Sequence, residues 1–124
     1  MRYMLLVYSQ EMEQTLAPDE DARIRAGHRA VMEETARRGI LQGAEPLQST
    51  RSATTVRWQR GQPLITDGPF AETKEQLAGY YILDCRDLDE ALEWAARIPT
   101  GCQGRSGCIE VRPIAPMTPH AERD

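Results

Sequence analysis

The sequence of 124 residues has no run of about 18 apolar residues, the length that a membrane-spanning helix needs. Its short apolar start, residues 2–8, lacks the longer hydrophobic region and small-residue cleavage site of a signal peptide. Lysine is nearly absent, since Lys74 is the only one, and acidic residues outnumber basic ones by 19 to 15. A general nucleic-acid binder needs an excess of positive charge on one face. We therefore expect a soluble, cytoplasmic protein with neither a membrane segment nor a nucleic-acid partner.

Metal and cofactor motifs are also missing. The two histidines, His28 and His120, are far apart, and no ligand pair has helical or hairpin spacing. There is no GxGxxG, GxxxxGK[ST] or GxSxG motif, which argues against nucleotide binding and serine-type catalysis. The three cysteines include no CxxC pair and fit reduced thiols, so we disfavour a disulfide between Cys102 and Cys108. We expect no metal and no cofactor.

The length suits one domain, and we place it at residues 1–116 with a flexible tail at 117–124. Alternation and β-branched residues predict strands, including a hairpin that turns at Gly61-Gln62 in a type II′ turn. Caps and periodicity predict two helices, one opened by Pro18 and one by Asp87. The strands are expected at 2–8, 41–47, 54–60, 63–66, 79–85 and 108–114, and the helices at 18–38 and 87–98.

Each predicted helix has one apolar stripe that should face the sheet. In the first helix the stripe places His28 inward. Its members are Ile24, His28, Val31 and Thr35. In the second helix the stripe consists of Leu88, Ala91, Leu92, Ala95 and Ile98.

The order strand, helix, strand, hairpin, strand, helix, strand predicts an α+β fold. Without the hairpin it is βαββαβ, the ferredoxin-like arrangement, in which both helices cover one face of the sheet. Yet residues 2–8 and 79–85 are apolar on both faces. An exposed apolar face of this size needs a cover, and a second copy about a two-fold axis supplies it most simply. We therefore expect a homodimer.

The segment 66–81, which reads TDGPFAETKEQLAGYY, resembles the hallmark of the DGPF branch of the YCII-related proteins. The similarity continues through Asp87-Leu88-Asp89-Glu90-Ala91 and Glu110-Val111-Arg112-Pro113. The resemblance implies a ferredoxin-like subunit that pairs into a dimeric α/β barrel. It assigns no activity to most members of this branch, whose bacterial genes often lie near extracytoplasmic-function sigma factors.

The resemblance also implies a His–Asp pair in a cleft, suited to proton transfer on a small organic ligand. Arg25-Ala26-Gly27-His28 is similar to the segment that holds the histidine, while Glu11 and Asp67 are alternative carboxylates. The neighbouring candidates for ligand binding are Arg25, Gly68, Pro69, Phe70 and Lys74. The simpler interpretations are a core histidine bonded to a backbone carbonyl and a structural turn at residues 67–70.

Two functions follow from these residues. The first is a ligand-binding homodimer that performs cofactor-independent acid–base chemistry, an elimination or an isomerisation, with His28. The alternative is a non-catalytic accessory or ligand-sensing protein linked to sigma-factor regulation.

Overall fold

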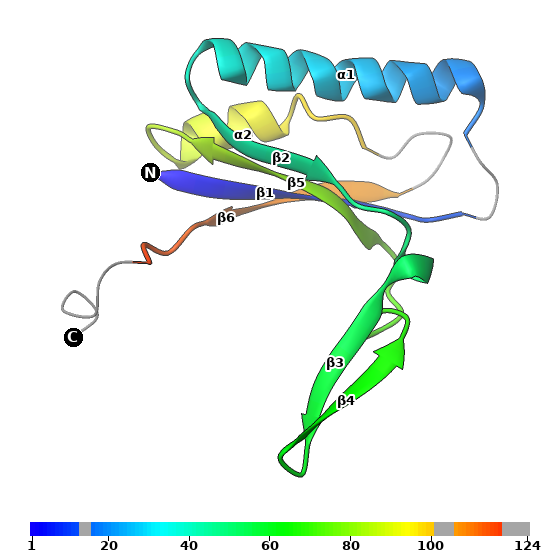
Figure 1. The fold of residues 1–124 in the computed structure, drawn as a ribbon. Coiled ribbons are helices and arrows are strands. Elements are labelled where there is room, and N and C mark those ends of the chain that lie inside the picture. Colours follow the sequence, from blue (N-terminus) through cyan, green and yellow to red (C-terminus); the bar gives the residue numbers. More distant parts are fainter. Residues whose placement is uncertain (13–15, 101–105, 118–124) are drawn as a thin grey trace.

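The computed structural model describes residues 1–12, 16–100 and 106–117. Cys102, His120 and nearly all of the expected tail lie outside these ranges. The element order confirms the expected α+β fold (Figure 1). In chain order the elements are β1 (Arg2–Ser9), α1 (Pro18–Arg37), β2 (Leu41–Pro46), the short 3₁₀ helix η1 (Thr50–Ser52), β3 (Thr54–Gln59), β4 (Gln62–Asp67), β5 (Gln76–Asp84), α2 (Leu88–Ala95) and β6 (Gly107–Pro113).

Four strands form one antiparallel sheet in the order β2-β5-β1-β6. This is the ferredoxin-like order, with β2 at an edge as its glycine and proline predict. Both helices lie on the same side of the sheet (Figure 1). Within the described residues, neither helix combines the length and the apolar character needed to cross a membrane.

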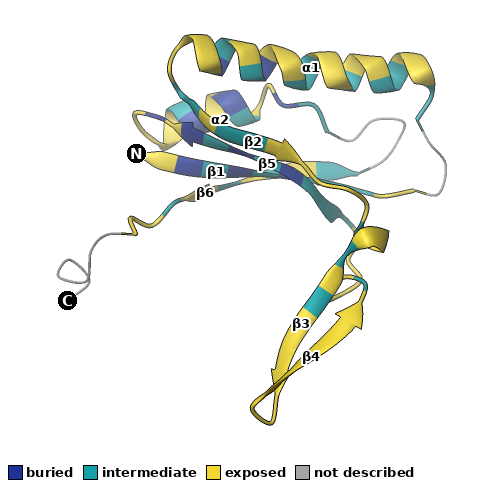
Figure 2. Cartoon of the chain, in the orientation of Figure 1, coloured by how far each residue is buried: buried dark blue, intermediate teal, exposed yellow. Residues whose placement is uncertain are grey.

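The sheet has one covered face and one open face. Tyr3, Leu5 and Val7 of β1 are buried beneath the helices, in a core that includes Val31 and Trp94. The alternate residues of β1 point the other way and are only half-buried (Figure 2). We call this second side the open face. Its apolar members are Met4, Leu6, Tyr8, Leu77, Tyr80 and Ile82.

Helix α1 begins and ends where its sequence predicts. Pro18 stands in the first turn among three acidic residues, and Gly39 follows the C-cap with a φ of 72°. Val31 and Thr35 are buried, and Ile24 and His28 are half-buried, so the predicted inward stripe is confirmed.

Helix α2 starts at its predicted N-cap, where the Asp87 carboxylate accepts a hydrogen bond from the Glu90 backbone N–H. Its predicted stripe is partly wrong. Trp94 is only 3% exposed, whereas Leu88 and Leu92 remain about half exposed. The helix therefore rotates toward the larger apolar surface of Trp94, whose ring also lies under the guanidinium group of Arg97.

The β3–β4 hairpin turns one residue earlier than predicted. Gln59 pairs with Gln62, so the two turn residues are Arg60 and Gly61. Both have positive φ, 53° and 77°, which is the signature of a type I′ turn rather than the expected type II′. The hairpin leaves the sheet on the side opposite the helices, and nearly all of it is exposed (Figures 1 and 2).

Candidate functional site

His28 lies between helix α1 and the covered face of the sheet. Its Nδ1 atom is 2.6 Å from the Tyr81 hydroxyl of β5, and the two atoms share a hydrogen bond. The rings stack with their centroids 6.0 Å apart and their planes 13° from parallel. Burial lowers the pKa of His28 and raises the pKa of Tyr81 to about 12. Both groups are therefore neutral near pH 7, and the side-chain partner of His28 is a phenol rather than a carboxylate.

Glu11, one of the two carboxylates proposed for that role, binds elsewhere. It follows the end of β1, and its carboxylate accepts hydrogen bonds from the Thr50 backbone N–H at 2.7 Å and the Thr50 hydroxyl at 2.9 Å. Its own backbone N–H donates to the Gln76 side chain at 2.7 Å. Glu11 thus joins the end of β1 to η1 and to the start of β5.

Asp67, the other proposed carboxylate, is the exposed last residue of β4. The following Gly68 has a φ of 99°, a conformation that glycine adopts readily. The Gly68 N–H donates to the Ala53 carbonyl, and the Thr55 hydroxyl donates to the Gly68 carbonyl, both at 2.7 Å. These bonds fasten the DGPF turn to the base of the hairpin.

Two other proposed ligand residues point into solvent. The side chain of Phe70 is 71% exposed, and its carbonyl accepts a hydrogen bond from Arg57 at 3.0 Å. Arg25 lies on the outer surface of α1 in a salt bridge with Asp21 at 2.8 Å. Pro69 is exposed as well. Among the described residues, no hydrogen bond joins His28 to Arg25 or to the DGPF turn, residues 67–70.

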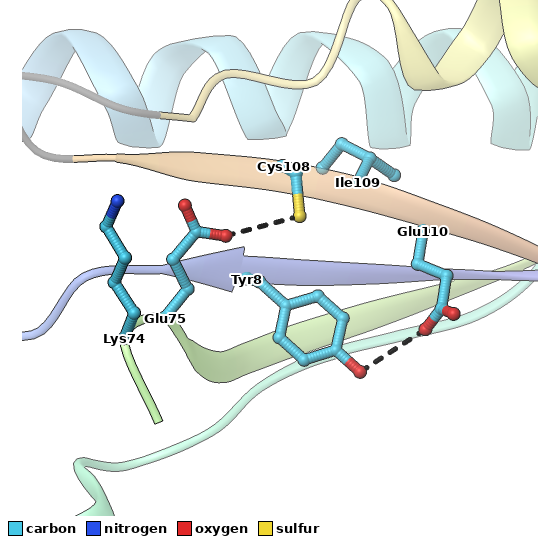
Figure 3. Close-up of a pocket in the computed structure, with 6 residues that line it drawn as sticks. All are labelled: Tyr8, Lys74, Glu75, Cys108, Ile109 and Glu110. Carbon is cyan, nitrogen blue, oxygen red and sulfur yellow. Dashed lines mark hydrogen bonds between the residues drawn. The ribbon is translucent and has the colours of Figure 1, made fainter. Parts of the chain in front are cut away.

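A shallow groove of about 620 Å³ lies on the open face where β1 ends and β6 begins (Figure 3). Tyr8, Cys108 and Glu110 extend from the sheet into it, away from the helices. Of the residues proposed from the sequence, it contains Lys74. The lining residues are Tyr8, Lys74, Glu75, Cys108, Ile109 and Glu110.

Two hydrogen bonds to carboxylates organise the groove. The Tyr8 hydroxyl donates to Glu110 at 3.4 Å, and the Cys108 thiol donates to Glu75 at 3.5 Å (Figure 3). Burial, followed by the neighbouring Glu110, raises the pKa of Tyr8. Burial and the bond to Glu75 raise the pKa of Cys108. The phenol and the thiol therefore stay protonated near pH 7 and act as donors, so Cys108 is not an activated nucleophile.

The groove and His28 lie on opposite sides of the same sheet. Tyr81, the partner of His28, belongs to the covered face, whereas Tyr8 belongs to the open face. Cys108 pairs directly with Tyr8, and Glu110 follows two residues later on the same face. This cluster was not predicted from the sequence. Cys108 and Glu110 are two residues apart on one predicted strand, and this spacing places both side chains on the same face of the sheet. In the described part of the chain, no three His, Cys, Asp or Glu side chains are grouped as metal ligands.

Comparison with known proteins identifies a family and a related protein. The sequence model of the YCII-related domain matches residues 1–118. An uncharacterized protein of Rhizobium meliloti (strain 1021) is 38% identical over 120 residues, which cover 96% of each chain. Both matches span the whole α+β fold, including the hairpin and the groove.

Proposed function

The chain belongs to the YCII-related domain family, and from this premise we propose that it is a homodimer that binds a small organic ligand in the groove of the open face. The observation that carries the proposal is the composition of that groove. Two carboxylates, an ammonium group, a phenol and a thiol line it together with the apolar side chain of Ile109, and the apolar side chains of the open face lie beside it. Polar groups next to an apolar surface are typical of binding sites for small molecules.

The open face supports the homodimer. Its central side chains, among them Leu6, Tyr80 and Ile82, are apolar and only half-buried in the single chain. A contiguous apolar surface of this kind marks an interaction site. A second copy related by a two-fold axis covers the same patch on both chains at once. The groove, which is shallow in one chain, then becomes an enclosed pocket.

The polar groups of the groove favour a ligand that carries amino or hydroxyl groups. Glu75 and Glu110 provide acceptors, and they outnumber the single cation, Lys74. A polyanion would meet two like charges there, which cost binding energy in a partly dry site. The single hydrogens of Tyr8 and Cys108 are already donated to Glu110 and Glu75, so the phenol oxygen provides a further acceptor for the ligand.

A second candidate function is cofactor-independent acid–base catalysis, with His28 moving a proton in an elimination or an isomerisation. Its supporting observation is the short hydrogen bond between half-buried His28 and Tyr81. A neutral imidazole is able to accept a proton, and the phenol fixes its tautomer. The non-catalytic alternative, a ligand sensor linked to sigma-factor regulation, requires only the groove.

A thermal-shift screen with matched variants tests the ligand site. Amines, polyols and carboxylates are added to the wild type, to Glu110→Gln and to Glu33→Gln, whose exposed side chain on α1 provides the control. A ligand at 100 times its dissociation constant stabilises the protein by about 2.7 kcal/mol. We expect amine or polyol hits that Glu33→Gln keeps and Glu110→Gln loses. Compounds that still stabilise Glu110→Gln but no longer stabilise His28→Asn would instead indicate a binding site beneath α1.

A further inference from the structure

The β3–β4 hairpin has one apolar face that no part of the described chain covers. The pairing register places Val56 opposite Ile65 and Trp58 opposite Pro63 on the same side. Val56 is 56% exposed, Ile65 67% and Trp58 73%. The reverse side carries Thr55, Arg57 and Gln59 with their partners. The hairpin is therefore amphipathic, and its apolar side faces solvent in a single chain.

Such a hairpin needs support from outside its own two strands. An isolated two-stranded hairpin is marginally stable in water, and it becomes stable when a third element packs on its apolar face. All six residues of β4 are exposed, and within the described residues the main contacts of each hairpin strand are with the other. The hydrogen bond at its base, from the Gly68 N–H to the Ala53 carbonyl, joins the two residues that flank the hairpin strands. The preceding η1 bonds to the body through Thr50 and Glu11.

The position of the hairpin indicates what supports it. It leaves the sheet on the same side as the open face, so the hairpin and the open face form the two sides of one angle (Figure 1). Any molecule that covers the open face enters this angle and comes within reach of the hairpin. The proposed homodimer places a second copy there.

We propose that the β3–β4 hairpin is a dimerisation arm whose face of Val56, Trp58, Pro63 and Ile65 packs on the partner chain. The arm rests on the proposed homodimer and extends it. It also assigns a role to the DGPF turn, which closes the base of the arm through the hydrogen bonds of Gly68.

The size of the surfaces supports a second copy as the occupant. With strands about 4.8 Å apart and about 3.3 Å per residue, the four-stranded open face covers roughly 440 Å². Stable specific interfaces cover about 800 Å² per partner. Each chain would give one arm and receive one, and each arm contributes roughly 200 Å². The face and the two arms together reach the required area, and the arms supply nearly half of it.

Two adjacent residues of β4 provide a matched test. Ile65 lies on the apolar face of the arm, and Leu64 lies on the reverse side. Ile65→Thr and Leu64→Thr make the same kind of change, and both place a β-branched residue that suits a strand. Sedimentation equilibrium of the full chain gives the dimer dissociation constant. We expect Ile65→Thr to raise it at least about tenfold, as loss of a central anchor does, and Leu64→Thr to change it less than about threefold.

Trp58 reports on the arm directly, because Trp94 is the only other tryptophan and is buried. The difference between wild type and Trp58→Phe isolates its fluorescence. In the dimer, Trp58 should be protected from acrylamide quenching, and dilution to monomer should remove the protection.

Each other outcome overturns the arm in a recognisable way. The arm is refuted if the protein has twice the chain mass but Trp58 is freely quenched and the two threonine variants have equal dissociation constants. That result would leave the homodimer in place. A wild type of single-chain mass refutes both. Protection of Trp58 that appears only when phosphatidylcholine vesicles are added assigns the apolar face to a membrane surface and refutes the arm.

Discussion

Replacing His28 by alanine separates a packing role of this residue from a role on a ligand. The imidazole shares a hydrogen bond of 2.6 Å with Tyr81 and stacks on its ring. Alanine removes the imidazole, so it can neither bond to the Tyr81 hydroxyl nor stack on the Tyr81 ring. The variant therefore leaves a largely buried phenol without its partner.

The expected loss of stability follows from these two contacts. Leaving a buried hydrogen-bonding group without its partner costs about 1–3 kcal/mol, and loss of the aromatic stacking adds about 0.5–1 kcal/mol. We expect a decrease of about 2–3 kcal/mol in the free energy of unfolding. For a chain of this length that corresponds to a Tm lower by roughly 8–12 °C. Urea unfolding followed by circular dichroism measures the first quantity, and a thermal scan measures the second.

Because of this pair, the difference in unfolding free energy between the wild type and the variant depends on pH. Burial lowers the pKa of His28 in the folded state, whereas the unfolded chain binds the proton near pH 6.5. Stability from the neutral imidazole is therefore complete above about pH 6.5 and is lost as the pH falls through the lowered folded pKa. His28→Ala lacks this contribution, so its deficit in unfolding free energy should shrink between pH 7.5 and pH 5.

Three results would refute this account of His28. The first is a variant as stable as the wild type, and the second is a disadvantage that stays constant across the pH range. The third is normal stability with lost ligand affinity, which would assign His28 to a ligand. We expect the ligands of the groove to bind His28→Ala as tightly as the wild type, because the groove lies on the opposite face of the sheet.

The remaining predictions concern the close packing of β2 against β5 and the thiol of Cys85. A Cβ atom on Gly79 would lie 2.7 Å from the Glu45 carbonyl oxygen of β2, so we expect Gly79→Ala to lower stability by about 1–3 kcal/mol in urea unfolding. Gly43→Ala, whose nearest new contact is a flexible Ile82 methyl at 3.8 Å, should stay within about 1 kcal/mol of the wild type, and equal effects of the two changes would argue against the tight approach. Burial, aided by Glu90, raises the pKa of Cys85 to about 11. Peptide mass spectrometry should find Cys85 unmodified by iodoacetamide at pH 8 in the folded protein and modified in urea, and rapid labelling of the folded chain would contradict its burial.

The sequence was sufficient for the parts of the fold that local patterns determine. The first strand, helix α1 with its inward stripe, and the edge strand β2 follow from alternation, periodicity and capping. The turn of the hairpin was misplaced by one residue. A positive φ was expected to begin at Gly61, because glycine adopts it readily, but Arg60 has a positive φ as well. Helix α2 was rotated in the prediction, because Trp94 was left out of its stripe.

The groove depended on pairing that the sequence does not display. Tyr8, Glu75 and Cys108 are far apart along the chain, and they meet only because β1 lies between β5 and β6. The hydrogen-bond partner of His28 was missed for the same reason, since Tyr81 is 53 residues away. The DGPF segment was conspicuous in the sequence, yet its loop is fastened to the base of a hairpin rather than to His28.

The homodimer on which the groove and the arm depend is tested most directly by its mass. Multi-angle light scattering of the full chain at micromolar concentration measures that mass without labels or substitutions. We predict twice the 14.0 kDa of one chain. A monodisperse species of 14.0 kDa that persists as the concentration rises would contradict the homodimer.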